Sequence, residues 1–196
     1  MSRAVSSAVD HPPPAPPSAL SPLMARVVDG DRIAFATLVQ ALQGPGLRLA
    51  DRTLDDSAAA QDVVQVALTR LWTLADRFDP ARGSVEGWFR RIVVNLCLDR
   101  RRASRPLVPL DAALAVASPA PDPLAAAIAG DARARLAAAM AHLGERQRAA
   151  LSLFHGDGLT MAEIAEVLGT TPKAVEGLLT RARIELKTLI GPIDRD

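Results

Sequence analysis

The sequence has a single cysteine, no tyrosine and few aromatic residues of any kind, 3% of its 196 residues. One cysteine, Cys97, excludes an intrachain disulfide and a cysteine-rich zinc cluster. The three histidines, His11, His142 and His155, stand in unrelated settings and form no metal-binding pattern. No apolar run reaches the roughly 18 residues needed to span a bilayer, and no hydrophobic signal core precedes the helices. We therefore expect a cytoplasmic protein without a metal or another cofactor.

Excess charge is also lacking, because the formal net charge is +1. Any surface for nucleic acid must therefore be local. Alanine and leucine dominate, which favours helices and predicts an all-α fold. We find no catalytic pairing, no phosphate-binding loop and no metal set, so an enzyme with a small-molecule substrate is the class that the sequence favours least.

Proline marks the domain organisation that we predict. Residues 1–21 form a disordered Pro-rich tail, 22–103 a first helical domain, 104–122 a flexible Pro-rich linker and 123–191 a second helical domain that opens with Asp122 and Pro123 as N-cap and first position. Within the first domain we expect Asp31, Ser57 and Ser84 to cap helices. Gly44-Pro45-Gly46 is expected to end the helix that Asp31 begins.

A helix is predicted over about residues 58–77. Its core stripe comprises Val63, Val66, Ala67, Leu71 and Leu74. A second apolar ridge, Val64, Leu68 and Trp72, rotates into the polar side that carries Asp62 and Gln65. Such a ridge is either covered by another helix of the same domain or forms a docking surface for a partner.

The stretch Gly87 to Arg102, GWFRRIVVNLCLDRRR, predicts a helix with two faces. Phe89, Ile92, Val93 and Leu96 are expected to form its core face. Arginines, an amide and an indole on the other side suit phosphates and unstacked bases, whereas the simpler interpretation is a solvated charged face.

The C-terminal stretch GLTMAEIAEVLGTTPKAVEGLLTRAR has the organisation of a helix-turn-helix. Thr160 and Glu163 predict a capping box on the short helix, and Thr171 caps the longer one. We expect the buried side of the longer helix to comprise Val175, Leu178, Leu179, Ala182, Leu186 and Leu189.

Taken together, AQDVVQVALTRLW, FDP, GWFRRIVVNLCLDRRR, the Pro-rich linker and the helix-turn-helix resemble the sigma factors of bacterial RNA polymerase, in particular the small extracytoplasmic-function (ECF) group with conserved regions 2 and 4. The resemblance covers about residues 22–190. It implies a stress-responsive transcription initiation factor that has no active site of its own. It also implies that an anti-sigma factor keeps this protein inactive. It also implies docking on the largest polymerase subunit through Asp62, Val64, Gln65, Leu68 and Trp72.

The resemblance implies two DNA-binding surfaces as well. The first opens the promoter and reads the minus-ten element as single-stranded bases, through Arg82, Ser84, Trp88, Arg90, Arg91, Asn95, Arg101 and Arg102. The second reads the minus-thirty-five element as duplex, with its domain on the flap of the second-largest subunit, through Thr171, Lys173, Glu176, Gly177, Thr180, Arg181 and Lys187.

Some residues depart from the family pattern. Val66 stands where the family usually has a glutamate, and Glu176, Gly177 and Leu178 replace positions that often carry basic residues and a serine. Losing positive charge in a groove weakens phosphate binding and changes which base is read. The departures leave a second hypothesis open, a sigma-like mimic that occupies an anti-sigma factor without binding promoters. A helix-turn-helix repressor with a helical dimerisation domain would explain only the C-terminal half.

Overall fold

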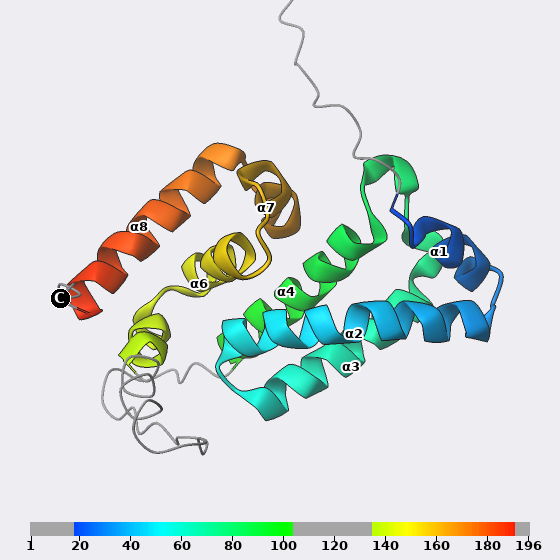
Figure 1. The fold of residues 1–196 in the computed structure, drawn as a ribbon, viewed down its shortest axis with the longest axis horizontal. Helices are drawn as coiled ribbons and strands as arrows, with labels where there is room; N and C mark the ends of the chain where they lie inside the picture. Colours follow the sequence, from blue (N-terminus) through cyan, green and yellow to red (C-terminus); the bar gives the residue numbers. More distant parts are fainter. Residues whose placement is uncertain (1–17, 104–134, 191–196) are drawn as a thin grey trace, which may run out of the picture.

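The computed structural model describes residues 18–103 and 135–190, and these ranges contain helices and no strand (Figure 1). The all-α prediction is therefore confirmed. The described ranges cover residues 22–103 of the first predicted domain and 135–190 of the second. Residues 18–21, predicted as the end of the disordered tail, are part of the fold, because the Ser18 hydroxyl donates to a Glu86 carboxylate oxygen at 2.6 Å and a helix begins at Ser21. The predicted tail up to residue 17, the linker 104–122 and the Asp122–Pro123 helix start lie outside the described residues.

The first domain packs three long helices around one core, with a short helix at its edge. The elements are α1 (Ser21–Val28), α2 (Arg32–Leu54), α3 (Ser57–Thr73) and α4 (Val85–Ala103), with 3-10 turns at Ala75–Arg77 and Pro80–Arg82. Asp31 caps α2 as predicted, because its carboxylate accepts from the backbone N–H groups of Ile33 and Ala34. Asp56, one residue before the predicted Ser57, caps α3 by accepting from the N–H of Ala59.

The prediction that Gly44-Pro45-Gly46 ends a helix is wrong. Helix α2 continues through Pro45 to Leu54. A side chain before a proline clashes with its ring in helical conformation, and Gly44 has no Cβ to clash. Gly46 is buried against α4, where a Cβ would lie 2.8 Å from Phe89 Cε1. Tertiary packing of α2 on α4 thus outweighs the local signal of the three residues.

The second domain is a short helical array around the predicted helix-turn-helix. Helical residues 135–142 are followed by α6 (Glu145–Leu151), a π-helical turn (Ser152–Gly156), α7 (Met161–Leu168) and α8 (Pro172–Ile190). The capping box is confirmed, since Glu163 accepts from the N–H of Thr160 at 2.8 Å and the Thr160 hydroxyl accepts from the N–H of Glu163 at 3.3 Å. Thr171 caps α8 by accepting from the N–H of Ala174.

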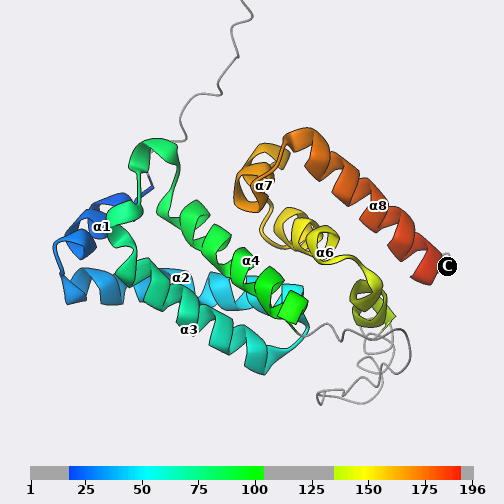
Figure 2. The same cartoon turned by 180° about the vertical axis from the view of Figure 1, so that it is seen from behind.

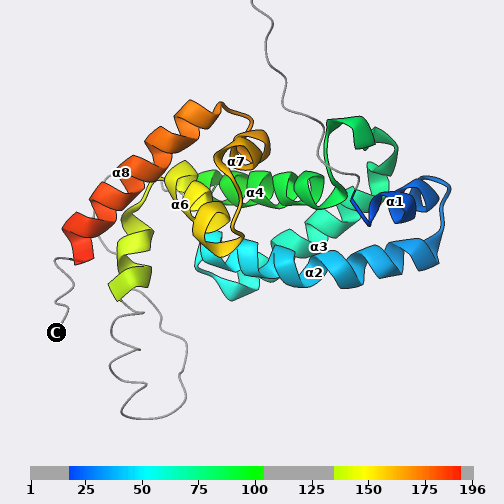
Figure 3. The ribbon, with the colours of Figure 1, turned by 45° about the horizontal axis from the view of Figure 1, so that its top comes forward.

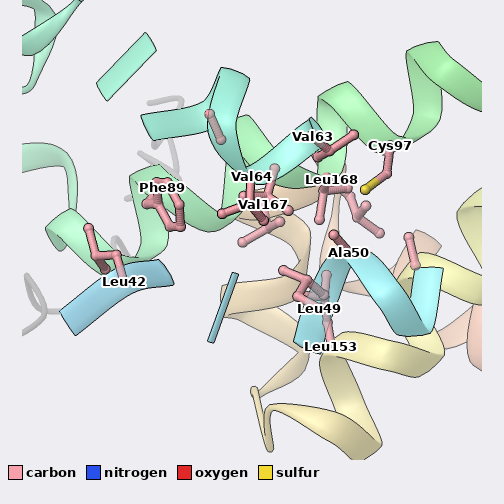
Figure 4. Close-up of a cluster of buried hydrophobic side chains, with 14 of the residues drawn as sticks. Leu42, Leu49, Ala50, Val63, Val64, Phe89, Cys97, Leu153, Val167 and Leu168 are labelled. Carbon is pink, nitrogen blue, oxygen red and sulfur yellow. The ribbon is translucent and has the colours of Figure 1, made fainter. Parts of the chain in front are cut away.

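The two domains pack against each other. Helix α7 lies along α4, and α6 and the π turn lie at the C-terminal half of α2, as the front, rear and tilted views all show (Figures 1, 2 and 3). Their apolar side chains form one continuous buried cluster (Figure 4), which includes Leu49, Ala50, Val63, Val64 and Cys97 of the first domain and Leu153, Val167 and Leu168 of the second.

Candidate polymerase and nucleic-acid interfaces

Helix α3 carries the residues predicted to dock on polymerase, but its apolar ridge is not a surface. Val64 is 2% exposed and Leu68 is 6% exposed, both within the core. Trp72 is half-buried and packs edge to face on Phe35 of α2, with 5.0 Å between ring centroids. The prediction that the ridge is exposed is therefore wrong. Helix α2 covers the ridge. Helix α3 packs against both α2 and α4, so a wider arc of its surface is buried than one apolar stripe would indicate.

The exposed side of α3 is polar with one apolar exception. Asp62 and Gln65 are exposed, and Val66, predicted to lie in the core stripe, is 43% exposed. Beside them α2 and α3 form a hollow of about 300 Å³ lined by Gln43, Leu47, Gln61, Asp62, Val64 and Gln65. Of the five predicted docking residues, Asp62 and Gln65 thus lie on an accessible surface, and Val64 lines the base of the hollow.

Helix α4 is buried over a wider arc than the sequence pattern indicated. Phe89 and Val93 are buried as predicted, but Ile92 and Leu96 are only half-buried. Val94 and Leu98, which were not assigned to the core, are 0% and 6% exposed. A second layer explains the difference, since α4 contacts α2 and α3 on one side and α7 on another.

The predicted minus-ten residues on α4 divide into two groups. Arg91, Asn95 and Arg102 are exposed, and they lie on one face at helical spacing. Arg90 and Arg101 instead face buried surroundings. The Nε of Arg90 lies 3.6 Å from an Asp157 carboxylate oxygen of the second domain, and Arg101 donates to the backbone carbonyl of Thr53 at 3.3 Å.

The remaining minus-ten candidates lie around the N-terminus of α4. The Ser84 hydroxyl accepts from the N–H of Gly87 at 3.0 Å, so Ser84 caps the helix as predicted. Arg82 is exposed on the preceding turn. Trp88 is half-buried, with 5.6 Å between its ring centroid and that of Phe78. An indole held in this way is pre-ordered for stacking at its accessible edge.

Helix α8 presents the predicted minus-thirty-five residues to solvent. Its buried side comprises Val175, Leu179 and Ala182, whereas Leu178 and Leu186 are half-buried and Leu189 is 47% exposed, against its assignment to the core. The opposite side exposes Thr171, Lys173, Glu176, Thr180, Arg181 and Lys187, with Gly177 half-buried beside them.

One ion pair changes the charge of this surface. The Nζ of Lys173 lies 2.7 Å from a Glu176 carboxylate oxygen, one turn away on the same face. Both side chains are largely exposed, so the pair stabilises the helix little. Its effect is on the local charge, because Glu176 neutralises Lys173 at the N-terminal end of α8, the end that is predicted to enter a major groove.

Burial shifts the pKa of two groups near the domain contact. It raises the pKa of the Cys97 thiol to about 12, so this cysteine is protonated and unreactive at neutral pH. Burial lowers the pKa of Arg148 to about 10, which leaves the guanidinium charged at neutral pH. Arg148 is 1% exposed, and its Nε and one terminal nitrogen have no hydrogen-bond partner among the described residues.

Between the domains lies one polar group that no pattern along the chain indicated. Asp157 lies between Gly156 and Gly158 after the π turn and forms ion pairs with Arg52 of α2 and Arg90 of α4. No helical periodicity relates residues so far apart in the chain. Within the described ranges no three His, Cys, Asp or Glu side chains come together as metal ligands, and no helix there combines the length and apolarity needed to cross a bilayer.

Comparison with known proteins places both halves of the chain. Residues 38–106 match the family model Sigma-70 region 2, and residues 133–186 match Sigma-70, region 4. The chain is 35% identical over 173 residues to ECF RNA polymerase sigma factor SigM of Mycobacterium tuberculosis, covering 86% of this chain and 83% of SigM. It is 29% identical over 185 residues to SigK of the same organism, covering 93% of this chain and 97% of SigK.

Solved structures agree with these matches. The structure of CnrH in complex with the cytosolic domain of CnrY is similar with a TM-score of 0.63 and 30% identity, over 86% of this chain and 94% of CnrH. The sigma factor RpoE from Bartonella quintana, solved with the anti-sigma factor NepR, shares the fold with a TM-score of 0.59 and 22% identity, over 82% of this chain and 98% of RpoE. The sequence matches to both regions and the fold together show that the chain belongs to the ECF sigma factors of bacterial RNA polymerase, which are transcription initiation factors and not enzymes.

Proposed function

We propose that this chain directs core RNA polymerase to specific promoters by docking through the exposed side of α3, opening the minus-ten element on α4 and reading the minus-thirty-five element with α8. The observation that carries the proposal is the exposed face of α4. Arg91, Asn95 and Arg102 share that face beside the half-buried Trp88, and they supply cations for phosphates, an amide for base edges and a ring for stacking.

We propose a docking surface with fewer residues than the sequence indicated. Asp62 and Gln65, with the exposed Val66 and the adjoining hollow, form the accessible surface, and a polymerase helix would bind across it. Leu68 and Trp72 support this surface from inside the domain. Replacing them would alter folding as well as docking, so they are poor probes of the interface.

For duplex DNA, Thr180, Arg181 and Lys187 are the proposed phosphate contacts, and Lys173 with Glu176 lies where base edges would be read. A carboxylate at this position accepts from the amino group of cytosine, and it also reduces the phosphate-binding charge of its neighbour. The minus-thirty-five sequence of this factor is therefore expected to differ from that of relatives with basic residues here.

We also propose that a protein partner holds the factor inactive until a stress signal arrives. CnrH, which shares 30% identity with this chain, was solved in complex with the cytosolic domain of another protein. An anti-sigma factor with a short cytosolic segment is the corresponding partner class.

Reconstituted transcription tests the central proposal. Core RNA polymerase with the full chain should yield discrete run-off transcripts from a subset of genomic promoter fragments, and core alone should not. Arg91→Ala and Asn95→Ala should reduce the transcripts at least tenfold without weakening binding to core polymerase. The exposed Arg32→Ala on α2 is the matched control and should leave the transcripts unchanged. Full binding to core with no transcript from any fragment would favour the anti-sigma mimic instead.

A further inference from the structure

Beside the apolar cluster that the two domains share, one carboxylate forms ion pairs across the contact. Asp157 accepts a hydrogen bond from Arg52 and forms an ion pair with Arg90, both of the first domain, and its side chain is only 15% exposed. The half-buried Arg52 packs closely against Gly156, where an added Cβ would overlap its guanidinium. The ion pairs from Asp157 to Arg52 and Arg90, here called the Asp157 bridge, therefore fix the helix-turn-helix domain on α2 and α4 at a defined position.

This position blocks part of the minus-ten surface. Arg90 is one of the arginines predicted to contact DNA, and here a carboxylate occupies the place that a phosphate would take. Arg91 lies beside the turn between α7 and α8, since a Cβ at Gly169 would be 3.8 Å from its guanidinium. The turn that leads into the reading helix α8 thus approaches the arginines of α4.

In this arrangement, here called the closed form, the two predicted DNA-reading surfaces also lie too close together for a promoter. Elements centred 10 and 35 base pairs upstream lie about 85 Å apart along B-form DNA, at about 3.4 Å per base pair. Helices α4 and α7 are in direct contact, so the two reading surfaces cannot reach both elements at once. The roughly 30 residues between Ala103 and Arg135 are sufficient for separation, because an extended chain of that length reaches about 100 Å.

The same interface holds features that favour its opening. Arg148 is buried there near Arg101 of the first domain, and two of its guanidinium nitrogens have no hydrogen-bond partner among the described residues, which destabilises the closed form. A cavity lined by Arg100, Arg101, His142 and Glu145, among others, leaves the contact incompletely packed. The apolar cluster that the two domains share and the Asp157 bridge together offset these unfavourable terms, so loss of the bridge shifts the equilibrium toward the open form.

We propose that the Asp157 bridge holds the free protein in a closed form that withholds Arg90 and its neighbours from DNA, and that promoter engagement requires the bridge to break. This inference rests on the proposed function for its biological meaning. The bridge itself can be tested without polymerase.

Energy transfer between two dyes measures the closed form in the full chain. Ala41→Cys on α2 and Thr188→Cys on α8 are exposed sites for maleimide dyes, and the buried Cys97 with its raised thiol pKa stays unlabelled. Arg52→Gln and Asp157→Asn should each lower the transfer efficiency, with about a tenfold shift of the equilibrium toward the open form. The double variant should shift it no further than either single variant, because both remove the same interaction.

Glu185→Gln is the matched control. It removes one negative charge, as Asp157→Asn does, but its carboxylate accepts from Gln147 inside the second domain. Transfer efficiency in this variant should equal that of the unsubstituted protein. Gly156→Ala provides an uncharged route to the same effect, because its methyl group displaces Arg52. Circular dichroism would verify that each variant remains helical.

Binding of a fluorescent single-stranded DNA of 20 nucleotides and mixed sequence reports how accessible the minus-ten surface is. Asp157→Asn should bind this strand about three- to tenfold more tightly than Glu185→Gln does. The two variants have the same net charge, but only Asp157→Asn frees Arg90 from its ion pair. Unchanged energy transfer in both bridge variants would overturn the bridge. Lower transfer with no gain in single-strand binding would overturn the withholding of Arg90. If the open variants were inactive with polymerase, the proposed function would be contradicted, whereas the inference about the Asp157 bridge would still stand.

Discussion

Gly46 sets how closely α2 approaches α4. A methyl group there would lie 2.8 Å from Phe89 Cε1, and Phe89 is 1% exposed and cannot move aside without displacing the core. Gly46→Ala is therefore expected to reduce the free energy of unfolding by about 1–3 kcal/mol through overpacking. Urea denaturation followed by circular dichroism measures this change.

Gly44→Ala is the control for that prediction, two residues away in the same helix. Its Cβ would lie 3.5 Å from the Arg48 side chain, an ordinary contact. The gain in helix propensity is opposed by the clash before Pro45, so the net change should stay within about 1 kcal/mol. Equal losses in both variants would show that the helix around Pro45, and not the contact with Phe89, limits stability.

Leu68 and Gln65 separate stability from docking on a single helix. Leu68→Ala should lower the free energy of unfolding by about 2–4 kcal/mol, since the side chain is 6% exposed in the core. Gln65→Ala should leave that energy within about 0.5 kcal/mol, because Gln65 is exposed, yet weaken binding to core polymerase. Denaturant unfolding and a polymerase pull-down with labelled protein give the two readouts. Normal polymerase binding by Gln65→Ala would remove Gln65 from the docking surface.

At the scale of the element, helix caps are the best-predicted features of this chain. Asp31, Ser84, Thr160 and Thr171 all accept the expected backbone hydrogen bonds. A cap depends on residues within one turn, so its signal is local and does not require knowledge of the tertiary structure.

The capping box of α7 has a pH signature. The hydrogen bonds from Thr160 lower the pKa of Glu163 below its usual value of 4.5. Glu163 therefore contributes stability that is present above pH 4.5 and is lost as the pH falls through its lower folded-state pKa. Glu163→Gln should flatten the pH dependence of thermal unfolding as the pH falls below 4.5. Glu166→Gln, an exposed position on the same helix, should retain the dependence of the unsubstituted protein.

Helix faces were predicted less well than caps. The resemblance implied that the ridge of α3 is a docking surface, and Val94 and Leu98 of α4 were not assigned to the core, but Val64, Leu68, Val94 and Leu98 are all buried. Periodicity identifies one apolar stripe on a helix, but it does not show whether a second neighbour covers the adjacent arc. For α4 that neighbour is α7, from the other domain.

At the scale of the whole molecule, Arg148 is the unfavourable charge of the domain contact. Arg148→Met keeps the length of the side chain and removes a buried cation with two nitrogens that lack hydrogen-bond partners among the described residues, so it should raise the free energy of unfolding by about 1–2 kcal/mol. Arg146→Met is the comparison on the same helix and should lower it by about 1 kcal/mol, because Arg146 donates to the Leu168 carbonyl at 2.8 Å. Thermal denaturation of both variants measures these changes in the free energy of unfolding. If Arg148→Met destabilised the protein, the Arg148 cation would have a favourable partner in solution.

The helical class, most helix starts, the helix-turn-helix and, through the combination of motifs, the sigma factor family could all be predicted from the residues along the chain. These properties depend on local periodicity and on short spacings. Three other features became visible only in the folded molecule: α2 continues through Pro45, α2 covers the ridge of α3, and Asp157 forms ion pairs with Arg52 and Arg90. Each of these depends on contacts between distant segments, where packing and charge pairing outweigh the preferences of single residues and no pattern along the chain records the partner.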